Sequence, residues 1–183
     1  MAFYDKFYIP NNATLSIAGD IDIDKTKELI AAYFGEIPRG ADVVQPTVQE
    51  PALGGEKVAV IYDNIQLPAM MMGYRMPPQT SDDAYALQMT SSVLSGGPSS
   101  RMYKRLVDED QTALQVFAFP FSLEQGGAFI TFSLANAGKT IDDMTPGLEE
   151  EIEKLQNELI SEREFQKIQN QMESNFIQSN SKM

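Results

Sequence analysis

Two residue types that supply much of the acid–base and metal chemistry of proteins are missing from this chain. Its 183 residues include no histidine and no cysteine. Without cysteine there are no disulfides, thiolate nucleophiles or thiolate metal sites. Without histidine there is no imidazole for a serine or cysteine triad. Because an ordinary zinc site needs imidazole or thiolate ligands, we expect no catalytic residue and no metal in this chain.

Long apolar runs and a surplus of basic residues are also missing. The longest apolar runs, such as residues 69–73, are far too short to cross a bilayer. Residues 1–10 carry Tyr4, Asp5 and Lys6 where a signal peptide would need an apolar core. Lysine and arginine number 14 against 26 acidic residues, a formal net charge of −12. An acidic surface repels phosphate, so we expect neither nucleic acid as a partner nor membrane insertion.

The length and the composition, with 43% apolar and 22% charged residues, are typical of a globular protein. The chain is long enough for one domain, or for one domain and a piece of another. Seven glutamates lie within residues 149–164 and predict the solvated face of a helix. Asp20, Asp22 and Asp24 resemble the start of a calcium loop. That loop needs glycine and glutamate where Lys25 and Ala31 stand, so turn and helix-cap roles are the better interpretation.

The first part of the chain predicts one strand, one helix and a linker. Residues 13–18 read as a short strand that ends at Gly19. Asp24 is expected to cap a helix that runs through Phe34. Proline and glycine then mark residues 39–56 as an extended linker, the clearest boundary in the sequence.

After the linker, the pattern predicts strands at residues 57–63 and 69–76. A helix capped by Ser81 or Asp82 should run to about Ser95, and a second helix should follow it. Residues 112–121 and 127–135 then read as a hairpin. Strand pairs joined by short turns favour an α+β fold, an antiparallel sheet with helices packed on one face.

Two more helices are expected at the end. The first has Leu148, Ile152, Leu155 and Leu159 on one face, and begins either at Thr145 with Pro146 or at a capping box of Thr140 and Asp143. The second follows Ser161, with an apolar stripe made of Phe165, Ile168, Met172 and Phe176.

Residues 94–107, LSGGPSSRMYKRLV, form a punctuated junction between two helices. Gly96 and Gly97 can take positive φ and end the first helix, and Ser99 or Ser100 can cap the second. Arg101 and Arg105 lie one turn apart and could bind a carboxylate. Pairing with nearby acids such as Asp108 or Glu109 is the favoured interpretation. Similarly, Met70–Met72 is interpreted as adaptable sheet packing rather than a binding surface.

Several stretches resemble the insulinase-like (pitrilysin-type) zinc metallopeptidases. They are residues 7–20 with the YFGEIP that ends the next helix at 33–38, then residues 68–75, Tyr85-Ala-Leu and the junction at 94–107. In this order they are similar to the second-domain region of bacterial members, called the inactive domain. The resemblance implies a half-domain like that of the mitochondrial processing peptidase.

The resemblance also implies a division of the chain. Residues 1–38 would be the last strand and helix of a preceding catalytic domain, and residues 39–56 the linker. Residues 57–183 would be the second, non-catalytic domain, truncated at its C-terminus. In the family, zinc is bound on an inverted H-x-x-E-H helix with a further glutamate. None of that motif is present, so zinc is expected in the upstream domain of the parent protein.

The substrate-binding halves of these enzymes commonly carry an arginine and a tyrosine after the Ser-Ser-Arg helix. Here Val107 and Leu114 occupy those two positions, and neither can donate a hydrogen bond from its side chain. In two-subunit members the zinc motif and the Arg–Tyr pair lie on different chains. The resemblance therefore implies the zinc-bearing chain of such a pair, with a homologous partner subunit.

The function that these observations favour is a non-catalytic segment of a bacterial zinc metalloendopeptidase. It would form part of the peptide-enclosing chamber and contact the catalytic domain and the partner subunit. The alternative is a structural or interaction domain of a family member without proteolytic activity. A location in the bacterial envelope or periplasm is implied by the resemblance alone.

Overall fold

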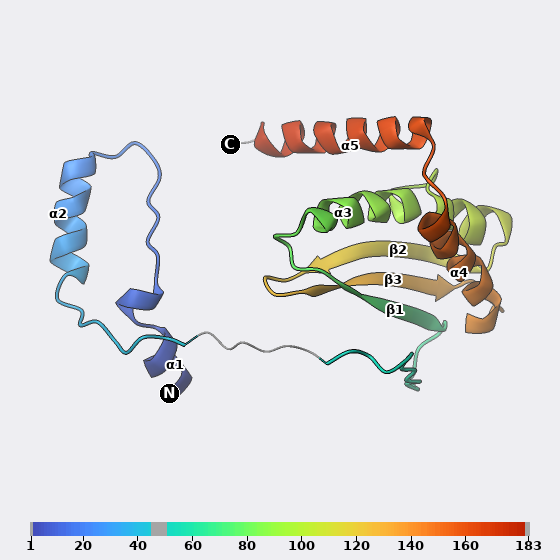
Figure 1. Cartoon of the computed structure of the whole chain (residues 1–183), viewed down its shortest axis with the longest axis horizontal. Helices are drawn as coiled ribbons and strands as arrows, with labels where there is room; N and C mark the ends of the chain where they lie inside the picture. Colours follow the sequence, from blue (N-terminus) through green and yellow to red (C-terminus); the bar gives the residue numbers. More distant parts are fainter. Residues whose placement is uncertain (1, 45–50, 182–183) are drawn as a thin grey trace. The chain divides into compact units, whose positions relative to one another are not determined.

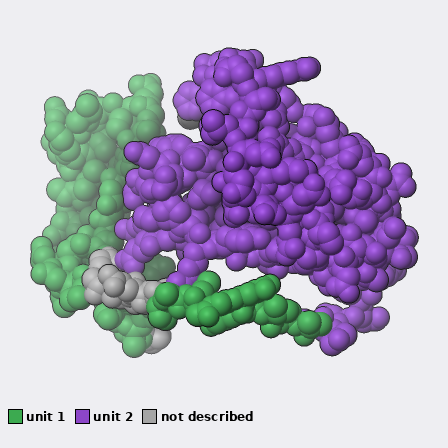
Figure 2. Space-filling view, turned by 45° about the vertical axis from the view of Figure 1, so that its right-hand side comes forward, with its two compact units in different colours: residues 1–60 green, residues 61–183 purple. Residues whose placement is uncertain are grey.

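A computed structural model describes residues 2–44 and 51–181 of the chain. The chain divides into two units, Met1–Val60 and Ile61–Met183, which are coloured separately in Figure 2. Each unit is described by itself below. Of the expected linker, residues 39–44 and 51–56 contain no helix or strand, and residues 45–50 lie outside the described residues.

The first unit contains three short helical elements: α1 (Ala2–Phe7), the 3₁₀ turn η1 (Pro10–Asn12) and α2 (Ile23–Phe34). Helix α2 is capped by Asp22 and not, as predicted from the sequence, by Asp24. The Asp22 carboxylate accepts hydrogen bonds from the backbone amides of Asp24 and Lys25, each at 3.0 Å. None of the described residues in this unit is buried. The described part of the first unit therefore has no hydrophobic core of its own.

Two predicted strands do not form. Residues 13–18 and 57–63 are not strands, and neither segment pairs with a strand among the described residues. Their apolar side chains are exposed as a result, and Tyr62 is 93% exposed. Alternation shows that a segment could lie on a sheet, whereas a strand also needs the backbone of a neighbour to bond its amides and carbonyls.

The second unit contains a three-stranded antiparallel sheet in the order β1-β3-β2. Its strands are β1 (Ala69–Met76), β2 (Ala113–Ser122) and β3 (Gly127–Ala135). The first strand has the predicted bounds, and β2 and β3 form the predicted hairpin. Figure 1 shows α3 (Asp82–Ser95) along one side of the sheet, with α5 (Glu162–Asn180) farther out. The α+β architecture is confirmed.

The helix junction differs in detail from its prediction. Ser81 caps α3, and Gly96 ends it with an ordinary φ of −72°, while Gly97 takes the left-handed φ of 119°. The next element, η2 (Tyr103–Glu109), is a π-helix. Its start is not capped as expected, because the Ser100 hydroxyl donates to the Gly97 carbonyl at 2.6 Å and accepts no bond from a helix amide.

The last two helices both begin with a capping box. Thr140 and Asp143 start α4 (Ile141–Asn157), so the Thr145–Pro146 alternative is wrong and Pro146 lies inside the helix. Helix α5 follows Ser161 as predicted, and Ser161 and Glu164 form its capping box. The expected apolar face of α4 is shorter than predicted because Leu159 follows the end of the helix and is 98% exposed. Within the described parts of the chain, no helix is long and apolar enough to span a bilayer.

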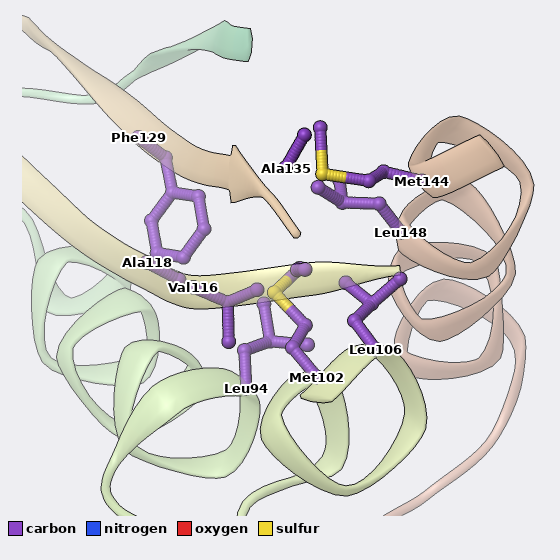
Figure 3. Close-up of a cluster of buried hydrophobic side chains, with 10 residues drawn as sticks. Leu94, Met102, Leu106, Val116, Ala118, Phe129, Ala135, Met144 and Leu148 are labelled. Atoms are coloured by element: carbon purple, nitrogen blue, oxygen red, sulfur yellow. The ribbon is translucent and has the colours of Figure 1, made fainter. Parts of the chain in front are cut away.

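The core lies between the sheet and the helices that cover one of its faces (Figure 3). Leu94, Met102 and Leu106 approach it from the α3–η2 region, and Met144 and Leu148 from α4. Met70 and Met72 pack against this core, as the sheet-packing interpretation expects, although Met71 between them is exposed.

Two buried hydroxyl groups weaken this core. Thr131 and Ser133 are fully buried on β3, and neither side-chain oxygen has a hydrogen-bond partner among the described residues.

We expect Thr131→Val to raise the free energy of unfolding by about 1 kcal/mol, because valine keeps the shape of the side chain and removes the unsatisfied hydroxyl group. Thr131→Ser keeps the hydroxyl and loses a methyl group, so it should lower stability by about 1 kcal/mol. Urea unfolding measures both, and a Thr131→Val protein no more stable than wild type would contradict the prediction.

Candidate functional site

The side of the sheet away from the helices, here called the outer face, is apolar. The three strands together contain a single charged residue, Arg75. The register places Met71, Phe132 and Phe117 in one row across the three strands, and Gly73, Ile130 and Phe119 in the next. An antiparallel sheet with one solvated face normally alternates apolar and polar residues, and this sheet does not.

Part of the helix-covered face also has smaller side chains than the outer face. The helix-covered face holds small or polar residues at Ala118, Thr131 and Ser133, whereas the outer face carries phenylalanine at three alternate positions of β2. Phe117, Phe119 and Phe121 are 48%, 42% and 53% exposed. A contiguous apolar patch of this kind marks an interaction or ligand-binding surface more often than plain solvent exposure. The outer face is therefore the candidate functional surface.

A second feature is a charged cluster on the helical side. Arg101 forms a two-pronged bond with Glu164 of α5, with Nε and Nη2 each 2.9 Å from a carboxylate oxygen. The Arg101 guanidinium is the main cause that lowers the pKa of Glu164 to about 2, and bonds from Ser161 add to it. The same contact raises the pKa of Arg101.

Arg105 and Lys154 extend this cluster to α4. Arg105 lies 3.1 Å from Asp110 and 3.4 Å from Glu150, and Lys154 lies 2.9 Å from Glu150 and 2.8 Å from Glu151. The hydrogen bond from Lys154 is the main cause that lowers the pKa of Glu150. Pairing with a nearby acid is thus confirmed for Arg105, although the acid is Asp110 and not Asp108 or Glu109. Arg101 pairs instead with Glu164 of α5.

The cluster borders a cavity of about 390 Å³ whose lining carries both signs of charge, including Arg101, Lys104, Glu109 and Glu158. Three of its four cations already pair with carboxylates of the same chain. The arrangement ties η2 to α4 and α5. It offers no surplus of positive charge to an anionic ligand.

The two positions aligned with the Arg–Tyr pair lie in different surroundings. Val107 belongs to η2 and packs against the core, whereas Leu114 lies on β2 and is about half exposed. Neither side chain can polarise a peptide carbonyl. Their assignment to the Arg–Tyr positions stays a prediction, since it depends on the register of the resemblance.

The side chains present do not fit a zinc ion. The sequence offers no imidazole or thiolate, and residues 2–44 and 51–181 contain no group of three acidic side chains placed to hold a metal. In the segment that resembles a calcium loop, the Asp22 carboxylate is bound to helix amides.

Sequence reasoning missed three features of these sites. The outer face could have been found, because β3 reads as apolar at both alternations (Ala128, Ile130, Phe132 and Leu134 against Phe129 and Ala135). The partner of Arg101, Glu164 of α5, is recognisable in the sequence only as a helix-capping residue. The π-helix had no signal, because its residues are ordinary helix formers.

The fold and these sites define a two-layer α+β domain with an open apolar sheet face and without the side chains of a zinc peptidase centre. A sequence profile described as the peptidase M16 inactive domain matches residues 1–172. The chain belongs to this family. The resemblance to insulinase-like zinc metallopeptidases is thereby confirmed.

Named relatives agree with this assignment. The zinc protease PqqE of Helicobacter pylori is 27% identical over 178 residues, which are 96% of this chain and 40% of that protein. The crystal structure of a protease from Helicobacter pylori has a TM-score of 0.85 at 27% identity, covering 97% of this chain and 44% of that one. A peptidase M16 inactive domain from Pseudomonas fluorescens shares the fold alone, with a TM-score of 0.70 at 15% identity over 93% and 41% of the two chains. The chain thus spans less than half the length of these relatives.

Proposed function

We propose that this chain is a non-catalytic segment of a bacterial zinc metalloendopeptidase, and that its outer sheet face forms part of the wall of the chamber that encloses the peptide. The observation that carries the proposal is the exposed row Phe117, Phe119 and Phe121 on a strand without charge. A chamber wall must contact peptides of many sequences, and apolar contact with main-chain hydrogen bonding suits that task.

The division of the chain is part of this proposal. Residues 1–38 would complete the sheet of a preceding catalytic domain, and residues 57–183 would form the second domain. Residues 39–56 would be the linker between these two domains. The absence of buried residues in the described part of the first unit supports this division, because a segment that belongs to another sheet should have no core of its own.

The proposed partners would supply the zinc site and the substrate-binding residues that this chain lacks. Zinc and its general base would belong to the upstream catalytic domain. An arginine and a tyrosine that bind the scissile peptide would come from a homologous partner subunit, since Val107 and Leu114 cannot act in that way.

The first test uses the chain alone and then the parent protein. We expect the 183-residue chain to hold no stoichiometric zinc by metal analysis and to leave fluorogenic peptides uncut. In the parent protein, Phe119→Asp should lower kcat/KM for peptides at least tenfold, because a carboxylate on the wall opposes apolar contact. Gln178→Asp adds the same charge on exposed α5 and serves as the matched control, expected to stay within twofold.

Two results would overturn the proposal. One is a tightly held zinc ion on the isolated chain. The other is unchanged peptidase activity in a folded Phe119→Asp parent that retains its zinc. A parent sequence without an inverted zinc motif upstream would favour the structural-domain alternative instead.

A further inference from the structure

Met71 is the one exposed thioether in the described part of the chain. The sequence has ten methionines and no cysteine, so its sulfur chemistry belongs to methionine alone. Met1 and Met183 lie outside the described residues. Among the other methionines, Met71 is 66% exposed and the rest are half-buried or buried. Met102 and Met144 mark the opposite extreme, because both are fully buried in the core.

The exposure of Met71 follows from its position in β1. Successive side chains of a strand point to opposite faces, so Met71 stands on the outer face while Met70 and Met72 pack against the core. Its neighbours on the same face of β1 are Ala69 and Gly73. A Cβ added at Gly73 would meet no atom within 4 Å. These small residues leave the side chain of Met71 open to solvent along the strand.

Met71 also belongs to the apolar row that crosses all three strands of the outer face. It is directly opposite Phe132, which is in turn opposite Phe117. The rings of Phe117 and Phe132 are stacked, with their centroids 6.3 Å apart. A change in the polarity of Met71 therefore changes one end of an apolar row on the candidate functional surface.

We propose that Met71 is a peroxide-sensitive modification site, and that its oxidation to the sulfoxide weakens apolar binding on the outer face. The sulfur atom attacks one oxygen of hydrogen peroxide. An S–O bond forms, the O–O bond breaks, and the other oxygen leaves with both protons as water. The thioether is thus oxidised by two electrons and the peroxide is reduced. The inference rests on the proposed chamber role of the outer face and adds a means of regulating it.

Oxidation at Met71 changes the surface and leaves the core intact. The sulfoxide oxygen is a polar acceptor, and the apolar side chains of Phe117 and Phe132 offer it no donor. An apolar ligand that covers this oxygen removes its water without replacing the lost hydrogen bond, so the ligand binds less tightly. The same oxygen on Met102 or Met144 would disrupt core packing instead.

The first measurement is the rate at which hydrogen peroxide oxidises each methionine of the folded 183-residue chain. Peptide mapping by mass spectrometry detects the added oxygen, and fragment ions separate Met71 from Met70 and Met72. We expect Met71 to be oxidised at least tenfold faster than Met102 and Met144, because the peroxide must reach the sulfur atom.

The second measurement is the affinity of the chain for the apolar fluorescent dye anilinonaphthalene sulfonate before and after oxidation. We expect oxidation to raise the Kd at least threefold, and methionine sulfoxide reductases for both epimers to restore it. Met71→Leu keeps an apolar side chain without sulfur, so its Kd should not respond to peroxide. Met172→Leu makes the same change at a half-buried position of α5 and should respond like wild type.

Met71→Gln supplies a polar side chain without any oxidant. It should raise the Kd for the dye as oxidation does, and circular dichroism shows whether each variant and each oxidised protein keeps its fold. This variant separates the polarity of residue 71 from any other effect of peroxide on the chain.

Three results would contradict the proposal: oxidation of Met71 no faster than that of the buried methionines, an unchanged Kd in fully oxidised wild type, or an equal response in Met71→Leu. These measurements use neither zinc nor turnover, so their failure leaves the parent's response to Phe119→Asp as a separate test of the chamber role. If the oxidation results hold while Phe119→Asp leaves the parent fully active, the modification site stands and the chamber role falls.

Discussion

Leu106→Ala is expected to lower the free energy of unfolding by about 3–5 kcal/mol, a large share of the stability of a domain this size. Leu106 is fully buried at the contact between η2 and α4. A Cβ placed on Gly147 would come within 2.9 Å of a Leu106 methyl, so the leucine lies directly against the backbone of α4. The rest of the core holds the backbones of η2 and α4 apart, so they cannot move together to fill the cavity that alanine would leave.

Urea unfolding followed by circular dichroism measures this loss. Leu159→Ala is the matched control, because it removes the same atoms from a side chain that is 98% exposed and should change stability by less than about 0.5 kcal/mol. Leu106→Met, which nearly conserves volume, should cost less than about 1.5 kcal/mol and stays measurable if the alanine variant does not fold. A loss below about 1 kcal/mol for Leu106→Ala would show that η2 does not pack against α4 in this way.

Elements with local stop and start signals could be predicted closely. Ser81 caps α3 as predicted, and α5 follows Ser161 as predicted. Such signals act within a few residues, so they do not depend on what the rest of the chain does. The sheet of the second unit and its helix-covered face follow from them.

Two of the predictions that failed depend on partners distant in sequence. Residues 13–18 have the pattern of a strand and no neighbour to pair with. For Arg101 the sequence favours a nearby acid, but its partner Glu164 lies 63 residues away. Tertiary contact decides each of these outcomes.

The Arg101–Glu164 pair should make the stability of the second unit depend on acid pH. A carboxyl group can have a lower pKa in the folded protein than in the unfolded chain. Its charged form then stabilises the fold. This stabilisation is complete at a pH above the unfolded pKa, and it is lost as the pH falls through the folded pKa. For Glu164 these values are 4.5 and about 2. We therefore expect its contribution to disappear between about pH 4.5 and pH 2. Since its side chain is 35% exposed, solvent screening reduces the contribution to about 1–2 kcal/mol.

Glu164→Gln isolates this effect, because glutamine preserves the capping box with Ser161 while removing the charge that pairs with Arg101. The variant should be about 1–2 kcal/mol less stable than wild type at pH 7, and the difference should shrink toward zero near pH 2. Glu162→Gln, in the first turn of the same helix, controls for loss of negative charge near a helix start. Other carboxyls with lowered pKa values, Asp143 and Glu150, titrate in both proteins and cancel in the difference.

A double-mutant cycle with Arg101→Met assigns the effect to the pair rather than to the helix end. If the ion pair is the cause, the coupling energy should be at least about 1 kcal/mol at pH 7 and should fall with the pH in the same window. The carboxylates Glu151 and Glu158 also raise the pKa of Arg101 and remain in every variant, so they lower the cost of an unpaired guanidinium in Glu164→Gln. A difference between wild type and Glu164→Gln that is constant from pH 7 to pH 2 would place the stabilisation in the cap and not in the charge.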